Sequence, residues 1–314
     1  SGSACCVYGL TFTSHFYGAR RTVGYVPFSS ETLVTGKLFE DIKEAVEGLA
    51  DPENYDAIVV TNLCVPTASG VPLRLLGKAI NGVRIIGIDV PGFGIPTHAE
   101  AKDVLAGAML SYAREEVMAG PVAAPRERSD RPSVALLGEM FPADPVVIGQ
   151  MLEPLGLAAG PVVPTREWRE LYAALDCAVV AAIHPFYTAS IREFQAAGRT
   201  IVGSAPVGHD GTMEWLAAIG AAYNVAPDLI AAAQNAFGPA IKAALAANPI
   251  WNPGCTPNLL TCRHGGSVRS TSSASSTRCW SACRAPARPW WNASSAATPR
   301  CTARASCCRS RRRW

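Results

Sequence analysis

The sequence has no acidic residues at one end: none of the 25 aspartates and glutamates follows Asp228 in this chain of 314 residues. Residues 252–314 also lack Lys, Ile, Met, Phe, Tyr and Gln, although they hold 11 arginines. Residues 1–250 carry 17 basic and 25 acidic groups, a balance of −8, and the remainder carries +11. The net charge of +3 therefore averages two unlike segments and does not indicate a nucleic-acid-binding protein.

Long hydrophobic runs are absent as well. No apolar stretch reaches the roughly 18–20 residues that span a bilayer, and the longest, such as Cys177–Ile183, have the length of a strand. The first residues, Ser1–Cys6, lack the basic region and the apolar segment of a secretion signal. With a hydrophobic content of 49%, these absences favour a globular cytoplasmic protein without a transmembrane segment.

Cysteine is scarce in the first 250 residues, which hold only Cys5, Cys6, Cys64 and Cys177, whereas seven cysteines follow Trp251. Four thiols in a segment of this length, without a secretion signal, are typical of a reducing compartment. They point to burial or metal ligation.

Nucleotide-binding and hydrolase motifs are absent. Thr35–Lys37 looks like the end of a P-loop, but Glu31 stands where the first glycine is required. Gly92–Gly94 is followed by Pro96 and Thr97, and the third glycine of a dinucleotide-binding loop is missing. No G-x-S-x-G elbow or H-E-x-x-H pair occurs. The chain therefore shows no nucleotide site of its own.

Residues 251–314 do not have the composition of a folded domain. They are rich in Arg, Ser, Ala, Cys, Trp and Pro, and show neither helical nor alternating periodicity. A basic disordered tail that binds nucleic acid or membrane is one interpretation. Such tails usually avoid Trp and Cys, however, whereas four of the seven tryptophans follow Trp251. We therefore expect a shifted reading frame in GC-rich coding sequence, which would yield about this mixture of residues.

Short apolar segments alternate with amphipathic ones over the first 250 residues, which predicts parallel α/β layers. Strands are expected over residues 55–61, 83–90, 133–137, 162–163, 177–183 and 200–204. Helices are expected over residues 71–80, 99–119, 145–155, 166–175, 188–197, 211–223 and 228–245. Thr97 and Thr165 are the predicted caps of the helices that follow them, with Glu100 completing the cap at Thr97, and Gly156 closes the helix before it.

A segment with three prolines and mixed charges, residues 120–132, divides these elements into two sets. The sequence predicts a first Rossmann-like domain over residues 1–120, a linker over 121–132 and a second Rossmann-like domain over 133–250. A tail over residues 251–314 follows. The expected fold class is thus α/β, with tandem doubly wound parallel sheets joined by right-handed crossovers.

Two cysteines are candidate ligands. Cys64 follows the predicted strand over residues 55–61, at the carboxyl edge where α/β proteins place their sites. Cys6 lies in a segment of small residues near the start of the chain. Thiolates at these positions can ligate a soft metal or an iron–sulfur cluster, but a buried cysteine is commonly just a small hydrophobic residue. Cys177 begins a predicted strand and is expected in the core.

Histidines give a weaker indication of a site. His184 and His209 each follow a predicted strand, on the side of the sheet where a ligand would bind, and His15 is close in sequence to Cys6. A lone histidine in a loop is more often structural or solvated, so both interpretations stay open.

Four segments resemble those of nitrogenase-like catalytic subunits. They are the cysteine segment Gly2–Phe12, the following loop Ser29–Leu38, the next ligand segment Val60–Gly70, and the segment Ile88–Gly94, which leads to a long helix. Within this family, the amino-acid sequence is most similar to the Y subunits of chlorophyllide a reductase, over about residues 1–250. The resemblance implies tandem Rossmann-like domains of the nitrogenase component 1 type.

The same resemblance implies a cofactor and a partner subunit. The catalytic component of the family is a heterotetramer of Y and Z subunits that share a [4Fe–4S] cluster at their interface. The matching ligands in this sequence are Cys6 and Cys64, and the neighbouring Cys5 leaves a one-residue alternative for the first. A further cysteine is expected before Ser1 and a third domain from about residue 251, so the chain is expected to be incomplete at both ends.

The resemblance also implies a reaction. An iron–sulfur ATPase, the X subunit, would supply single electrons, and the C7–C8 double bond of ring B of chlorophyllide a would be reduced. The absence of a nucleotide motif agrees with ATP being used by that separate subunit. Two alternatives stay open: a related nitrogenase-like subunit, such as one acting on protochlorophyllide, and a non-catalytic α/β binding protein whose cysteines are only core residues.

Overall fold

The computed structural model describes residues 23–123, 129–138 and 144–247. The strands are β1 (Ala57–Asn62), β2 (Ala79–Ile80), β3 (Val83–Asp89), β4 (Ser133–Leu137), β5 (Ala158–Val163), β6 (Val179–Ala182) and β7 (Thr200–Val202). The helices are α2 (Ser30–Val34), α3 (Lys37–Leu49), α4 (Cys64–Ala68), α5 (His98–Ala119), α6 (Pro145–Gln150), α7 (Trp168–Asp176), α8 (Thr188–Ala196), α9 (Gly208–Ala222) and α10 (Pro227–Ala247). Two short 3₁₀ helices are η1 (Leu73–Leu75) and η2 (Glu153–Leu155).

The strands of the described ranges form two sheets. The first has the order β1-β3-β2, in which β1 and β3 are parallel and the short β2 is antiparallel to β3. The second has the order β5-β4-β6-β7, and all of its neighbouring strands are parallel. Parallel strands joined by helices confirm the predicted α/β class.

Alternate residues of the central strand β4 face two different hydrophobic cores. Val134 and Leu136 belong to a core that also contains residues of α6, α9 and α10. Ala135 and Leu137 belong to a second core, with residues of α5, α7 and α8. Because side chains alternate along a strand, helices cover both faces of this sheet, which is the doubly wound arrangement.

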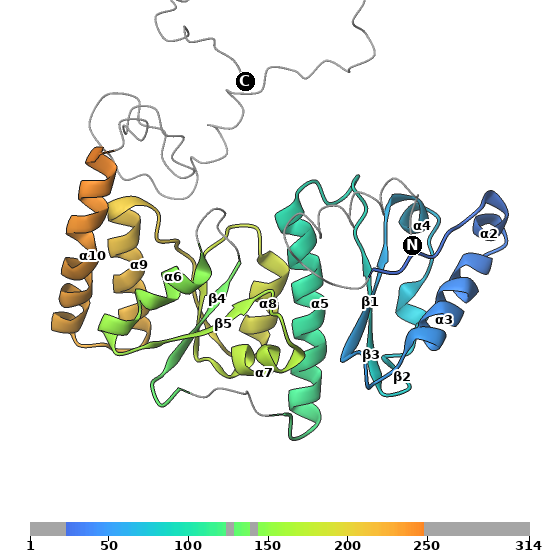
Figure 1. The fold of residues 1–314 in the computed structure, drawn as a ribbon, viewed down its shortest axis with the longest axis horizontal. Coiled ribbons are helices and arrows are strands. Elements are labelled where there is room, and N and C mark those ends of the chain that lie inside the picture. The colour runs from blue at the N-terminus through green and yellow to red at the C-terminus, as the bar shows by residue number, and fades with distance from the viewer. Residues whose placement is uncertain (1–22, 124–128, 139–143, 248–314) are drawn as a thin grey trace, which may run out of the picture. The chain divides into compact units, whose positions relative to one another are not determined.

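Strand β3 divides its side chains in the same way. Val83 and Ile85 pack with α3, whereas Ile86 and Ile88 share a core with α5 and with residues of the second sheet. Helix α5 therefore lies between the two sheets, as Figure 1 shows. None of the helices in the described ranges is both long and apolar enough to cross a bilayer.

Helix α5 begins as predicted. The Thr97 side chain accepts the N–H of Glu100, and the Glu100 carboxylate accepts the N–H of Thr97 at 3.2 Å. This reciprocal capping box satisfies backbone donors that the first helical turn leaves open.

The predicted helix over residues 71–80 is wrong. Residues 73–75 form only a 3₁₀ turn, and Ala79–Ile80 is the strand β2, which pairs with β3 through the turn Asn81-Gly82. Both turn residues have positive φ, 50° and 84°. Asn-Gly is the dipeptide that favours a two-residue hairpin of this kind, so the signal was in the sequence and outweighs the helical pattern.

Two other local predictions need correction. The helix predicted over residues 145–155 is broken into α6 and η2, because Pro154 has no N–H to donate to the fourth preceding carbonyl. Gly156 does end the segment, with φ 74°. Thr165 does not cap α7: its hydroxyl is buried without a hydrogen-bond partner, and the Glu170 carboxylate accepts the N–H groups of Arg166 and Glu167.

Sequence reasoning misses α2 and α3. Their signals are present: Ser29 and Thr32 form a capping box before α2, and α3 buries Leu38, Ile42 and Val46 at a spacing of four. This spacing places one apolar stripe against the first sheet.

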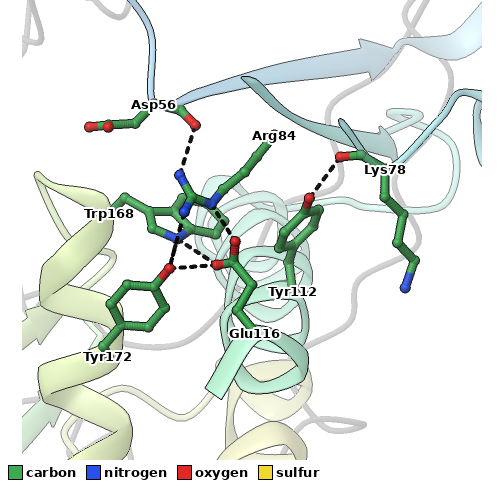
Figure 2. Close-up of polar contacts among 7 residues, drawn as sticks. All are labelled: Asp56, Lys78, Arg84, Tyr112, Glu116, Trp168 and Tyr172. Carbon is green, nitrogen blue, oxygen red and sulfur yellow. Dashed lines mark hydrogen bonds and ion pairs between the residues drawn. The ribbon is translucent and has the colours of Figure 1, made fainter. Parts of the chain in front are cut away.

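A hydrogen-bonded network joins β3 to α5 and α7 (Figure 2). Arg84 on β3 donates its Nε–H to Glu116 on α5 at 2.7 Å, and its guanidinium lies 4.8 Å from the ring centroid of Trp168 on α7. The other Glu116 oxygen accepts the Tyr172 hydroxyl at 2.6 Å and the Trp168 Nε1–H at 3.0 Å. Burial, and then the bond to Glu116, raise the pKa of Tyr172. The network fixes α5 and α7 to the amino end of β3.

Candidate functional site

The candidate ligand Cys64 lies at the carboxyl edge of the first sheet. Strand β1 ends at Asn62, and Cys64 is the first residue of α4, a single helical turn. Its thiol is free and half-buried. The sequence-based placement of Cys64 beyond the strand end is therefore correct, and the thiol is within reach of a ligand approaching this edge.

The loop after β3 supplies a hydrogen bond to this thiol. The backbone N–H of Gly92 donates to Cys64 Sγ at 3.2 Å. The loop is itself a tight turn, because the N–H groups of Gly94 and Ile95 both donate to the carbonyl of Pro91 at 2.9 Å. A Cβ at Gly92 would lie 3.6 Å from the sulfur, so the backbone passes close to the thiol.

A polar clamp joins the ends of β1 and β3 beside Cys64. Asn62 is fully buried, and its side-chain N–H donates to Asp89 Oδ1 at 3.1 Å and to the Val71 carbonyl at 3.1 Å. The Thr67 hydroxyl donates to the same Asp89 oxygen at 3.2 Å. The N–H of Val90 donates to the Asn62 carbonyl at 2.8 Å. These contacts fix the distance between the two loops that carry Cys64 and Gly92.

The two loops that carry Cys64 and Gly92 also present exposed apolar residues. Val65, next to Cys64, is 39% exposed, and Phe93, next to Gly92, is 70% exposed. Asp89 and Thr67 of the clamp, together with Arg74, line a hollow of about 180 Å³. The edge therefore combines one thiol, a backbone donor, a carboxylate and apolar surface.

The chemistry of this edge fits one ligand of an iron–sulfur cluster. Clusters are held by cysteine thiolates, and hydrogen bonds to their sulfur atoms are common tuning features. Cys64, with its free, accessible thiol and the Gly92 donor, meets both requirements. Cys6 and its alternative Cys5 lie outside the described residues. Within the described ranges, no group of three or more His, Cys, Asp and Glu side chains is arranged to hold a metal ion.

Cys177 has a different environment. It is 4% exposed, and its sulfur lies 3.3 Å from the Ser133 hydroxyl in the core around α7. Burial raises the pKa of the Cys177 thiol above its ordinary value, so the neutral form is favoured. The prediction that Cys177 is a core residue is confirmed.

The histidines that follow strands are held by local contacts. His184 follows β6, and its Nδ1 accepts the N–H of Phe186 at 3.3 Å while its ring packs against Phe186 and Tyr187. His209 lies in the first turn of α9, with Nδ1 2.8 Å from an oxygen of Asp210. His15 lies outside the described residues.

Three residues of this edge were not predicted from the sequence: Gly92, Asn62 and Asp89. Their only signal was position, since each lies at or just after the carboxyl end of β1 or β3. The hydrogen bond from the Gly92 N–H to the Cys64 thiol depends on how two loops meet. Neither segment alone specifies this bond.

Comparison with known proteins agrees with the fold. Residues 1–248 match the family of nitrogenase component 1 type oxidoreductases, and the chain belongs to this family. It resembles two solved structures described as nitrogenase Cp1 at pH 6.5 and at pH 5, with TM-scores of 0.52 and 0.50. The identities are 14% and 16%; each likeness covers 70% of this chain, and 42% and 44% of the other chains. At this identity the likeness supports the fold.

Two curated relatives are much more similar to this chain in sequence than the solved structures are. The chain is 80% identical over 251 residues to the chlorophyllide reductase 52.5 kDa chain of Cereibacter sphaeroides, covering 80% of this chain and 50% of that protein. It is 79% identical over 250 residues to the protein of the same name from Rhodobacter capsulatus, covering 79% and 50%. The chain thus spans about half the length of the curated relatives it matches.

Proposed function

We propose that this chain is part of a Y subunit of chlorophyllide a reductase, the catalytic component that reduces the C7–C8 double bond of ring B. The observation that carries the proposal is the Cys64 thiol, free and half-buried at the carboxyl edge of the first sheet, with the Gly92 N–H donating to it. The 80% identity to a protein named for this reductase supports chlorophyllide as the substrate class. Chlorophyllide a is therefore the expected substrate, in the cytoplasm.

Cys64 and Cys6 are the proposed ligands, and the partner Z subunit is expected to complete a [4Fe–4S] cluster. When bound, such a cluster supplies one-electron transfer. The role of Cys64 is to hold iron as a thiolate, and the polar clamp of Asn62, Asp89 and Thr67 keeps its loop in place. Exposed Val65 and Phe93 offer apolar surface that the Z subunit would cover, which removes water from the thiolate.

Electrons are expected to come from the X subunit, an iron–sulfur ATPase. Saturation of one carbon–carbon double bond takes two electrons and two protons. The hollow beside Asp89, about 180 Å³ in volume, is too small for a tetrapyrrole, which needs a larger apolar site. We infer that the macrocycle binds on a surface completed by other parts of the complex.

We also propose the domain division of residues 1–120, 121–132 and 133–250, and a shifted reading frame after about residue 250. The family match to residues 1–248 supports the position of that change. Sequencing the gene tests it: with one base restored, the frame should continue into an acidic segment rich in Leu and Val. A gene sequence whose restored frame has no such continuation would contradict this proposal.

An anaerobic assay of iron and sulfide in the Y–Z complex, made with the full-length frame-restored Y chain, tests the function. Wild-type protein should show a [4Fe–4S] spectrum and, with X subunit and ATP, reduce chlorophyllide a in preference to protochlorophyllide. Cys64→Ser and Cys6→Ser should lose or alter the spectrum, whereas Cys177→Ala, a core control, should keep it. A spectrum unchanged by both ligand substitutions would exclude the assignment.

A further inference from the structure

The hydrogen bond between Gly92 and Cys64 joins two loops that are 28 residues apart in sequence. Gly92 is exposed, so its N–H was free to point to solvent, yet it points at sulfur. Its neighbours Gly94 and Ile95 donate instead to the Pro91 carbonyl. Of these three donors in the turn, the Gly92 N–H is the one that contacts the candidate ligand.

The turn is held in place from both sides. Pro91 is buried, and the N–H of Val90 donates to the Asn62 carbonyl, two residues before Cys64. The Asn62 side chain then donates to Asp89, three residues before Gly92. Because both loops start from this clamp, the backbone of Gly92 is preorganised close to the Cys64 side chain.

An N–H donor on a thiolate has a predictable electrical effect. It partly neutralises the negative charge on sulfur, and hydrogen bonds to ionised groups are about twice as strong as neutral ones. Addition of one electron makes an iron–sulfur cluster more negative, so the bond stabilises the reduced state more than the oxidised state. Hydrogen bonds to cluster sulfurs accordingly raise the reduction potential.

We infer that the backbone N–H of Gly92 is a positioning group that raises the reduction potential of the cluster at Cys64. This inference rests on the proposed function, because it requires a cluster at that thiol. The step concerned is the reversible addition of one electron to the cluster; no covalent bond forms or breaks. In the titration described next, dithionite supplies the electron and is oxidised.

Gly92→Pro and Gly92→Ala form a matched pair. Proline removes the N–H, whereas alanine keeps it and adds a Cβ 3.6 Å from the sulfur, an ordinary contact. In the Y–Z complex, a redox titration followed by electron paramagnetic resonance should give a more negative midpoint for Gly92→Pro than for wild type. About a tenfold change in the equilibrium constant is expected, or about 59 mV for one electron. Gly92→Ala should match wild type.

Equal midpoints for the proline and alanine variants, both with full iron and sulfide content, would overturn the inference while leaving the proposed function intact. Absence of a cluster from the wild-type complex would instead contradict the proposed function. If Gly92→Pro does not assemble a cluster, wild-type complex labelled with ¹⁵N-glycine provides the second measurement. Pulsed resonance of the reduced cluster should then show coupling to a glycine amide nitrogen, and its absence would overturn the inference.

Discussion

Ser190 on α8 is bound twice by the Asp103 carboxylate on α5. One oxygen of Asp103 accepts the Ser190 N–H at 2.8 Å and the Ser190 hydroxyl at 2.7 Å, and the other accepts the Ala189 N–H at 2.7 Å. Asp103 is 4% exposed and Ser190 is fully buried. Helix α8 has no side-chain cap at Tyr187, so a carboxylate from another helix satisfies its first-turn donors.

Removal of this shared cap should weaken the fold. Asp103→Ala leaves the buried N–H and hydroxyl of Ser190 and the partly buried N–H of Ala189 without their acceptor, so we expect the free energy of unfolding to fall by about 2–4 kcal/mol. Glu47→Ala, at an exposed acidic position on α3, is the control and should change it by less than about 0.5 kcal/mol. Urea unfolding followed by circular dichroism measures both changes. A urea midpoint of Asp103→Ala equal to that of the wild type would contradict the proposed role of the cap.

The close approach of α5 and α8 gives a second test. A Cβ at Gly107 would lie 2.9 Å from the Ala189 Cβ, so Gly107→Ala should force the helices apart and cost about 1–3 kcal/mol. Gly48 on α3 has open space around it, and Gly48→Ala should stabilise by up to about 1 kcal/mol through helix propensity. The thermal midpoint should fall for Gly107→Ala and rise for Gly48→Ala. A Gly107→Ala protein as stable as wild type would show that the helices do not pack this closely.

The buried phenol of Tyr172 should make stability depend on alkaline pH. Its pKa is raised by burial and then by the bond to Glu116, so the folded state keeps the proton after the unfolded state has lost it. The stability from this group is therefore present below about pH 10 and lost as pH rises further. Urea unfolding between pH 8 and 11 should give a shallower decline for Tyr172→Phe than for wild type.

Loss of the Tyr172 hydroxyl also removes its bonds to Glu116 and Trp168, which should cost about 1–2 kcal/mol at neutral pH. Tyr25→Phe, at a 44% exposed tyrosine, is the control and should keep the wild-type pH slope. An unchanged slope in Tyr172→Phe would assign the alkaline decline to other groups.

The two described cysteines should differ in reactivity. Iodoacetamide reacts with accessible thiolate, whereas Cys177 is 4% exposed and its pKa is raised. At neutral pH in the native, cluster-free chain, we expect Cys64 to be alkylated at least about tenfold faster than Cys177. Peptide mass spectrometry measures both rates, and urea should make them similar. Comparable native rates would show that Cys177 is not a core residue.

Periodicity along the chain predicted several elements that bury a regular face, although it missed α3. Strand β4 has the predicted bounds, and α5 begins at its predicted capping box. Two of the failures lie where a single residue changes the local geometry. Asn81 allows a hairpin where a helix was expected, and Pro154 breaks a helix that otherwise keeps its pattern.

The candidate site was predictable only in part. Cys64 could be placed because a strand end is a local feature of the sequence. Its donor Gly92 and the clamp of Asn62 with Asp89 arise from the parallel register of β1 and β3, which pairs Asn62 with Asp89. Register is a property of two segments together, so a pass along one segment does not reveal it.

The cap that α5 provides to α8 has a consequence for biosynthesis. Asp103 and Ser190 are 87 residues apart, so a ribosome adding about 5–20 residues per second makes Ser190 about 4–17 s after Asp103. During that interval the α5 carboxylate has no α8 to cap, and that face of α5 stays open to water or to a chaperone. Only synthesis past Ala196, where α8 ends, completes the set of helices α5, α7 and α8 that share one core.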